Sequence, residues 1–255
     1  MIRENIRMVF RASGFGALTS LMLPAYLMRD RIASDASRAE VRRRWVHTWS
    51  GLLLDLFSID LEVLGAIPNE PGKGRLVVAN HRSAIDIGVL LRLFEGYMVS
   101  RNDLAGWPLI GAAARSVGTV FVDRSDSGSG ASAIRAMRTL LKSGETVCIF
   151  PEGTTFEGDE VRPFHQGAFI AALHTSAQII PVGIAYPVGS GAAFVNESFP
   201  AHLARMSRST RTRAAVSIGT PIEVGKRRAA DLSNEAHAAV QSLVQRSRVR
   251  LEGIQ

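Results

Sequence analysis

The sequence predicts an α/β protein, and two observations lead to this prediction. Short runs rich in Val, Ile and Phe alternate along the chain with longer runs whose apolar residues recur at helical spacing. Strands that alternate with helices are typical of a sheet flanked by helices. The 255 residues, 46% hydrophobic and 21% charged, suffice to bury a sizeable core and argue against disorder.

The N-terminal segment is apolar enough to associate with a membrane. Residues 12–28 form an uncharged run of seventeen residues, and as a helix this run would be about 26 Å long, at the lower limit for crossing a bilayer. Because Pro24 and two glycines weaken a continuous span, we expect a membrane-dipping hairpin or an in-plane helix, with a single span as the second choice. A buried helix of a soluble protein remains an alternative. A cleaved signal peptide is disfavoured, because no small-residue cleavage site precedes Arg29.

Residues 36–58 are predicted to form a second helix. Its apolar residues, Trp45 and Trp49 among them, recur at helical spacing behind a group of arginines. Tryptophans next to arginines suit a membrane interface, and the same stripe would serve equally well as core packing. We expect residues 1–58 to be membrane-associating helices and residues 59–255 to be one α/β domain, since neither a linker nor an internal repeat divides them.

The net charge of +7 is unevenly distributed. Residues 1–44 carry +5 and residues 201–255 carry +6, whereas residues 45–200 carry −4. Basic ends favour anionic partners such as phospholipid headgroups, coenzyme phosphates, an acidic carrier protein or nucleic acid. The single cysteine, Cys148, lies in an apolar run, so we expect a buried thiol in a reducing compartment and no intrachain disulfide.

The remaining elements follow in chain order. Strands are predicted over residues 59–63, 75–79, 97–100, 118–124, 146–150, 178–184 and 214–222. Helices are predicted over residues 86–94, 133–142, 168–176 and 231–251. A Gly/Ser-rich loop is predicted over residues 125–132, and the arginines between residues 205 and 213 form a basic cluster with no predicted element.

One strand-to-helix turn carries a candidate general base. His81 follows the predicted strand 75–79, and Asp86 opens the next helix, where an acidic residue suits the positive end of the helix dipole. Across such a turn, the Asp86 carboxylate can bind one imidazole nitrogen of His81, which fixes the tautomer and leaves the other nitrogen free to accept a proton. The alternative is that both residues only cap the helix.

Several other chemistries lack their sequence signatures. The chain contains no G-x-S-x-G elbow, no Walker loop, no G-x-G-x-x-G after a strand and no His/Cys cluster at metal-binding spacing. A base with an orienting carboxylate but no covalent nucleophile favours direct transfer to a substrate hydroxyl group.

Four sequence blocks resemble those of a known enzyme family and occur in its order. They are Asn80 to Asp86 (NHRSAID), Gly118 to Arg124 (GTVFVDR), Phe150 to Thr154 (FPEGT) and Ile180 to Gly183 (IPVG). The first resembles the NHxxxxD motif of the 1-acylglycerol-3-phosphate acyltransferase (lysophosphatidic acid acyltransferase, PlsC-type) family of glycerolipid acyltransferases. The resemblance covers about residues 59–190. It implies a mixed sheet flanked by helices, the glycerolipid acyltransferase fold, with residues 59–255 as the catalytic domain.

The resemblance also implies an activity and a set of site residues. A fatty acyl group would pass from acyl-CoA or acyl carrier protein to the free hydroxyl of 1-acylglycerol-3-phosphate, giving phosphatidic acid in phospholipid synthesis. His81 would be the general base, oriented and charge-stabilised by Asp86. The implied substrate-binding residues are Asn80, Phe121, Arg124, Glu152, Gly153, Thr154 and Pro181.

Particular roles are implied for some of these residues. Arg124 would bind the acceptor phosphate, for which a guanidinium group is well suited. Gly153 and Thr154 would offer hydrogen-bond donors, and Glu152 would position them or the acceptor. Pro181 would shape the pocket.

Departures from the family pattern concern the acceptor. The third block commonly continues with an arginine, where this chain has Thr155, and the segment around His165 lacks the basic residue usual there. The loss of a cation weakens the case for a phosphomonoester, although Arg162 is a candidate to compensate. The alternative acceptor is a different lysolipid, either a lysophospholipid or an amino-acid-linked lyso-lipid. Arg101 stands where a lysine is common and preserves the charge.

The resemblance implies no metal or redox cofactor, with acyl-CoA or acyl carrier protein as the co-substrate. The other expected partners are the lysolipid and an anionic membrane surface, on the cytoplasmic face of the cell membrane, with a monotopic or single short-span attachment. The rival class, a non-enzymatic binder of nucleic acid or anionic surfaces, would need basic residues gathered on one face with stacking aromatics. Because aromatics are 7% of the chain and the basic charge lies at its ends, we expect no nucleic-acid partner.

Overall fold

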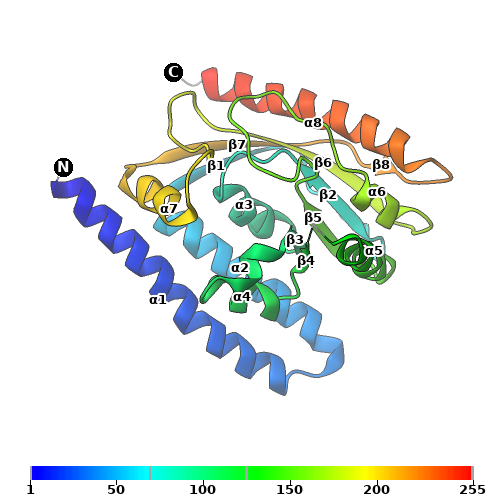
Figure 1. The fold of residues 1–255 in the computed structure, drawn as a ribbon, viewed down its shortest axis with the longest axis horizontal. Helices are drawn as coiled ribbons and strands as arrows, with labels where there is room; N and C mark the ends of the chain where they lie inside the picture. Colours follow the sequence, from blue (N-terminus) through cyan, green and yellow to red (C-terminus); the bar gives the residue numbers. More distant parts are fainter. Residues whose placement is uncertain (1, 69, 124–125, 254–255) are drawn as a thin grey trace.

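The structure is a computed structural model that describes residues 2–68, 70–123 and 126–253. Figure 1 shows a central sheet with helices on both faces. The helices are α1 (Ile2–Ile32), α2 (Asp35–Leu56), α3 (Ile85–Phe94), α4 (Ile110–Ser116), α5 (Ser127–Lys142), α6 (Gly167–Ala172), α7 (Phe199–Arg208) and α8 (Ala229–Glu252), with a 3₁₀ helix η1 (Asn102–Gly106). The strands are β1 (Ile59–Leu64), β2 (Arg75–Ala79), β3 (Tyr97–Arg101), β4 (Val120–Val122), β5 (Thr146–Ile149), β6 (Gln178–Ala185), β7 (Thr212–Ile218) and β8 (Ile222–Glu223).

The strand order places β2 near the centre of the sheet. The order is β1-β7-β6-β2-β5-β3-β4, with β8 paired to β6. In the described part of the chain, β6 is antiparallel to β7 and β8 and the other pairs are parallel, so the sheet is mixed, as predicted. Because β2 runs parallel to β5 and β6, the carboxyl ends of these three strands meet at one edge. This is the edge at which open α/β sheets bind ligands.

Each face of the sheet has its own hydrophobic core. Along β2, Val77 and Ala79 belong to the core under α2 and α3, whereas Leu76 and Val78 belong to the core under α5, α6 and α8. All four side chains are fully buried, as expected for a continuous apolar strand covered on both faces. Cys148 lies in the first core, and burial raises the pKa of its thiol to about 12, so it is an unreactive core residue, as predicted.

The N-terminal run 12–28 is one helix and not a hairpin. α1 continues through Pro24 to Ile32, and the chain turns at Ala33 and Ser34, so that α2 packs back against α1. The hairpin expected within this run is therefore wrong: a proline removes only one helical hydrogen bond, and here the neighbouring helices support the continuation. Among the described helices, none combines the length and hydropathy needed to cross a membrane.

Other boundaries differ from the sequence prediction. α5 begins at Ser127, inside the expected loop, because the Asp126 carboxylate accepts hydrogen bonds from the backbone N–H groups of Gly128 and Ser129. α7 was not predicted, although the hydroxyl of Ser198 caps its start. The last predicted strand is split into β7 and β8, since residues 219–221 break it with a glycine and a proline.

Candidate active site

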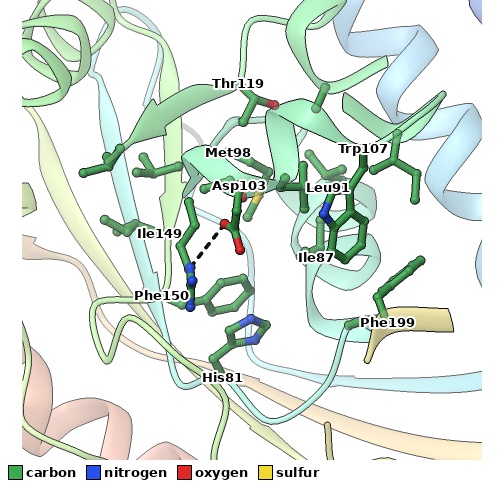
Figure 2. A pocket seen from close by; sticks show the side chains of 18 of the residues that line it. His81, Ile87, Leu91, Met98, Asp103, Trp107, Thr119, Ile149, Phe150 and Phe199 are labelled. Carbon is green, nitrogen blue, oxygen red and sulfur yellow. Dashed lines mark hydrogen bonds and ion pairs between the residues drawn. The ribbon is translucent and has the colours of Figure 1, made fainter. Parts of the chain in front are cut away.

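The sheet register brings the first and third sequence blocks together. Val78 of β2 pairs with Ile149 of β5, so His81 and Glu152, each three positions later, leave the sheet next to each other. The backbone N–H of His81 donates a hydrogen bond to Glu152 Oε1 over 2.7 Å. The imidazole ring stacks on Phe150, with ring centroids 3.9 Å apart and an interplanar angle of 6° (Figure 2). The ends of two strands therefore fix both the backbone and the ring plane of His81.

His81 and Asp86 make the contact that their spacing predicts. His81 Nδ1 lies 2.9 Å from Asp86 Oδ2, across the turn that leads into α3. The same oxygen accepts hydrogen bonds from the backbone N–H groups of Arg82 and Ser83, over 2.6 and 2.8 Å. Asp86 is fully buried, whereas the His81 side chain is 16% exposed and lines a large cavity. Because Nδ1 faces Asp86, Nε2 is the nitrogen available to a substrate.

A tyrosine that the sequence analysis missed completes the surroundings of the carboxylate. Tyr186 Oη donates a hydrogen bond to Asp86 Oδ1 over 2.5 Å. Burial raises the pKa of the Tyr186 hydroxyl well above its usual value, and the neighbouring Asp86 charge raises it further, so the phenol keeps its proton. The two residues are 100 positions apart in the chain, and the sequence carries no signal that pairs them.

Arg82, a position that the motif leaves unspecified, ties the loop after β5 to the candidate base. Its guanidinium group forms an ion pair with Glu152 over 2.8 Å and donates to the carbonyl groups of Gly158 and Glu160 over 2.6 and 2.7 Å. The other oxygen of Glu152 accepts a hydrogen bond from the backbone N–H of Arg162 over 2.7 Å. Arg82 and Glu152 are both buried. Glu152 therefore positions the loop, while the cavity wall is formed by its neighbours.

Besides Glu152, three of the implied substrate-binding residues do not line the cavity. Asn80 is fully buried, and its carboxamide makes hydrogen bonds with both backbone groups of Ile184, over 2.7 and 2.8 Å, so it joins β2 to β6. Pro181 is buried within β6, where it pairs with Val78, and Phe121 is in the middle of β4. These three residues belong to the strands around the site or to their ends, and their side chains do not line the cavity.

The glycine of the fourth block has a packing role. α8 lies across β6 (Figure 1), and a Cβ atom added at Gly183 would lie 2.3 Å from backbone atoms of Leu243 and Val244. Only a residue without a side chain allows the helix to approach the strand this closely.

The loop after β5 brings Gly153 and Thr154 to the cavity wall. Gly153 has a φ of +79°, which favours glycine, and its N–H donates to the Phe150 carbonyl over 3.0 Å. That N–H is therefore used within the turn, whereas Thr154 is exposed at the cavity. Thr155 donates its hydroxyl to the carbonyl of Phe194 and presents no charge.

Of the two arginines expected near an acceptor phosphate, Arg124 lies outside the described residues, so its contact stays a prediction. Arg162 faces the ring of Phe156, with its guanidinium carbon 5.0 Å from the ring centroid, and it pairs with Glu160 over 3.7 Å. It does not line the cavity, so it does not replace the cation that is absent at Thr155.

The cavity beside His81 is large and mostly apolar. Its volume is about 1380 Å³, and its walls come from α1, α2, α3, α4, α5 and the start of α7. Figure 2 shows Ile87, Leu91 and Met98 along the wall, with Trp107 and Phe199 facing each other nearby. A space of this size and character suits hydrocarbon chains, and it reaches a nitrogen able to accept a proton. Among the described residues, no group of three or more His, Cys, Asp or Glu side chains is arranged to hold a metal ion.

Comparison with known proteins gives the family. The family model described as Acyltransferase matches residues 60–185. The lyso-ornithine lipid O-acyltransferase of Pseudomonas aeruginosa is 30% identical over 92% of this chain and 93% of that protein, and the 1-acyl-sn-glycerol-3-phosphate acyltransferase of Neisseria meningitidis is 30% identical over 60% and 59%. The crystal structure of the PlsC acyltransferase of Thermotoga maritima covers 97% of each chain with a TM-score of 0.78 at 20% identity, which confirms the predicted fold. The chain is thus an enzyme that esterifies a lysolipid with an acyl donor, and it belongs to the 1-acylglycerol-3-phosphate acyltransferase (PlsC-type) family of glycerolipid O-acyltransferases.

Proposed function

We propose that this enzyme acylates the free hydroxyl of lyso-ornithine lipid, an amino-acid-linked lysolipid, and that 1-acylglycerol-3-phosphate is the less favoured acceptor. The observation that carries this proposal is the charge of the cavity wall beside His81. A phosphomonoester carries up to two negative charges and needs cations, whereas an ornithine headgroup carries an ammonium group together with a carboxylate.

The described wall is short of cations. Arg101 is the only arginine or lysine among the described lining residues, and its side chain binds Asp103 over 3.2 Å. The acidic residues Asp103, Asp123, Asp126 and Glu197 also line the cavity, and of these Glu197 is paired with Arg205. Thr155 occupies the place where an arginine would serve a phosphate. This balance favours an acceptor with a positive group, and the similarity to the Pseudomonas aeruginosa protein over nearly the whole chain supports the same acceptor.

The proposed mechanism uses His81 as general base. Nε2 takes the proton of the acceptor hydroxyl while its oxygen attacks the thioester carbonyl of acyl-CoA or acyl carrier protein. Asp86 stabilises the imidazolium, which returns the proton to the departing thiolate, so that an ester and a free thiol result. Thr154, exposed at the cavity, is the proposed donor to the developing oxyanion. No metal or redox cofactor takes part in this proposal.

The acceptor is tested by thiol release from long-chain acyl-CoA and from acyl carrier protein, with lyso-ornithine lipid and 1-acylglycerol-3-phosphate offered separately. We expect kcat/KM for lyso-ornithine lipid to be at least about tenfold higher, the factor that one charge-assisted contact supplies. Thr155→Arg should move this ratio toward 1-acylglycerol-3-phosphate, because it restores a cation beside the base. A wild-type preference for the phosphomonoester would overturn the acceptor proposal and leave the acyltransferase chemistry unchanged.

The enzyme would reach its lipid substrate by binding to an anionic membrane surface through α1. In this proposal α1 lies in the plane of the membrane, on the cytoplasmic side, where thioester donors occur. One face of α1 exposes apolar side chains at helical spacing, namely Ile2, Ile6, Phe10, Leu21, Met28 and Ile32. Arginines lie in the first and last turns of this helix. This arrangement favours the in-plane attachment that the sequence suggests.

If α1 attaches the enzyme to the membrane, placing charged residues on its exposed apolar face should weaken binding to vesicles. The double variant Ile6→Glu, Phe10→Glu should bind vesicles containing anionic phospholipid at least about tenfold more weakly, since each apolar side chain contributes about 1.5–3 kcal/mol when buried. Flotation with vesicles measures the change. Val249→Glu is the matched control, because Val249 is similarly exposed but lies on α8, over the opposite face of the sheet. Equal binding of both variants would contradict attachment through α1.

A further inference from the structure

The Asp86 carboxylate has two differently used oxygens. Oδ2 receives the His81 ring and the N–H groups of Arg82 and Ser83. These donors are local to the turn, and they hold the side of the carboxylate that faces the base. Oδ1 points the other way, into the protein, where its hydrogen bond comes from Tyr186. The orientation of the carboxylate about its long axis therefore depends on a residue from a different element.

Tyr186 is itself held firmly. It follows β6, two residues after Ile184, whose backbone is clamped by the Asn80 carboxamide. The carbonyl oxygen of Tyr186 accepts a hydrogen bond from Arg248 of α8 over 2.6 Å, and Arg248 is in turn paired with Asp159 over 2.7 Å. The tyrosine ring is buried. The backbone hydrogen bonds on both sides of Tyr186 therefore hold its phenol in place next to Asp86.

His202 and Ser83 form a second buried polar group next to the contact between Tyr186 and Asp86. His202 of α7 lies with Nε2 3.4 Å from the hydroxyl of Ser83 and Nδ1 3.0 Å from Glu197. Ser83 and His202 are almost completely buried. The hydroxyl of Ser83 also interacts with that of Tyr186. Ser83, which His202 contacts from the other side, therefore helps to hold the phenol in the position from which it donates to Asp86.

We propose that Tyr186 is a positioning residue of the acyl transfer reaction: its hydroxyl fixes the Asp86 carboxylate and sets how strongly that carboxylate attracts the proton held by His81. The inference rests on the proposed roles of His81 and Asp86. A carboxylate that accepts one strong hydrogen bond more is a weaker base. Removal of the Tyr186 hydroxyl therefore strengthens the attraction of Asp86 for the imidazolium and loosens its orientation.

Tyr186→Phe tests the proposal, because it keeps the ring and removes only the hydroxyl. We expect kcat to fall about tenfold, of the order of one hydrogen bond to a charged group, with KM for acceptor and donor unchanged. We also expect the acid limb of the kcat/KM profile to move to higher pH, because imidazolium is the favoured form over a wider range. Tyr97→Phe is the matched control, since Tyr97 packs under Arg42 and does not line the cavity.

A fluorinated tyrosine placed at position 186 gives a second test that does not depend on the stability of Tyr186→Phe. It retains the hydroxyl but makes it a stronger donor, so the acid limb should move to lower pH, opposite to the effect of Tyr186→Phe. In an Asp86→Asn background, Tyr186→Phe should cause a smaller loss than in the wild type, because the two residues act through one contact.

The results for the Tyr186 and His81 variants together distinguish failure of the Tyr186 proposal from failure of the proposed mechanism. If either Tyr186 variant leaves kcat and the pH profile unchanged while His81→Ala is inactive, Tyr186 is only structural and the proposal is overturned. If His81→Ala retains activity with both lyso-ornithine lipid and 1-acylglycerol-3-phosphate, the proposed mechanism itself is wrong. Opposite shifts for the two variants support the proposal.

Discussion

His81→Ala should lower kcat for acyl transfer by about 10² to 10⁴, the range that a positioned general base supplies. The structural reason is specific. Nε2 of His81 is the proton acceptor at the cavity, and the nitrogen on the other side of the ring is engaged by Asp86 over 2.9 Å. Among the described residues, no second histidine pairs with a carboxylate at the end of β2. No other imidazole there can therefore act as the base when His81 is removed.

The fold should survive this substitution. The His81 side chain is partly exposed and contributes a stacking contact with Phe150, while the backbone N–H that binds Glu152 is retained in alanine. Thiol release and the thermal unfolding midpoint are measured on the same preparation. His174→Asn is a suitable control, because His174 is exposed and asparagine tolerates its φ of 60°. Activity of His81→Ala above about a tenth of the wild-type value would exclude the assignment of this residue as the base.

Among the substitutions named for this protein, Arg82→Met should cause the largest decrease in the free energy of unfolding. The variant leaves the Glu152 carboxylate buried without its cation, and breaking one partner of a buried ion pair typically costs about 3–5 kcal/mol of unfolding free energy. The carbonyl groups of Gly158 and Glu160 lose a donor as well. Denaturant unfolding measures the change. Activity should fall further than stability alone requires, because the loop that carries Thr154 loses one of its anchors to the turn of His81 while the hydrogen bond from the His81 N–H to Glu152 remains.

A partner substitution distinguishes this explanation from a general packing effect. Adding Glu152→Gln to Arg82→Met removes the unpaired charge, so the double variant should be more stable than Arg82→Met alone. Arg228→Met, which breaks the exposed pair with Asp231, should leave unfolding unchanged within error. If Arg82→Met and Arg228→Met unfold at the same denaturant concentration, the buried ion pair does not stabilise the loop.

The parts of the site that were predictable from sequence are local. His81 and Asp86 are five residues apart across one turn, so their contact follows from the end of β2 and the start of α3. The start of α5 was missed even though it too is local, because serine and glycine have low helix propensity and hide the cap that Asp126 provides. Asn80, Phe121 and Pro181 were assigned to substrate because their blocks flank the site. Sequence alone does not tell which side of a strand faces the cavity.

The sequence by itself determined the α/β class, the family and the pair of His81 and Asp86, since these depend on periodicity, motif order and spacing within one turn. The tertiary structure alone decided that Arg82 meets Glu152, that Tyr186 meets Asp86, and that α1 and α7, which are far apart in the sequence, both contribute to the cavity wall. The physical reason is the sheet order. β2 lies between β5 and β6, so residues about 70 and 100 positions away meet at the ends of β2. Hydrophobic periodicity predicts that these strands exist but does not specify which of them are neighbours.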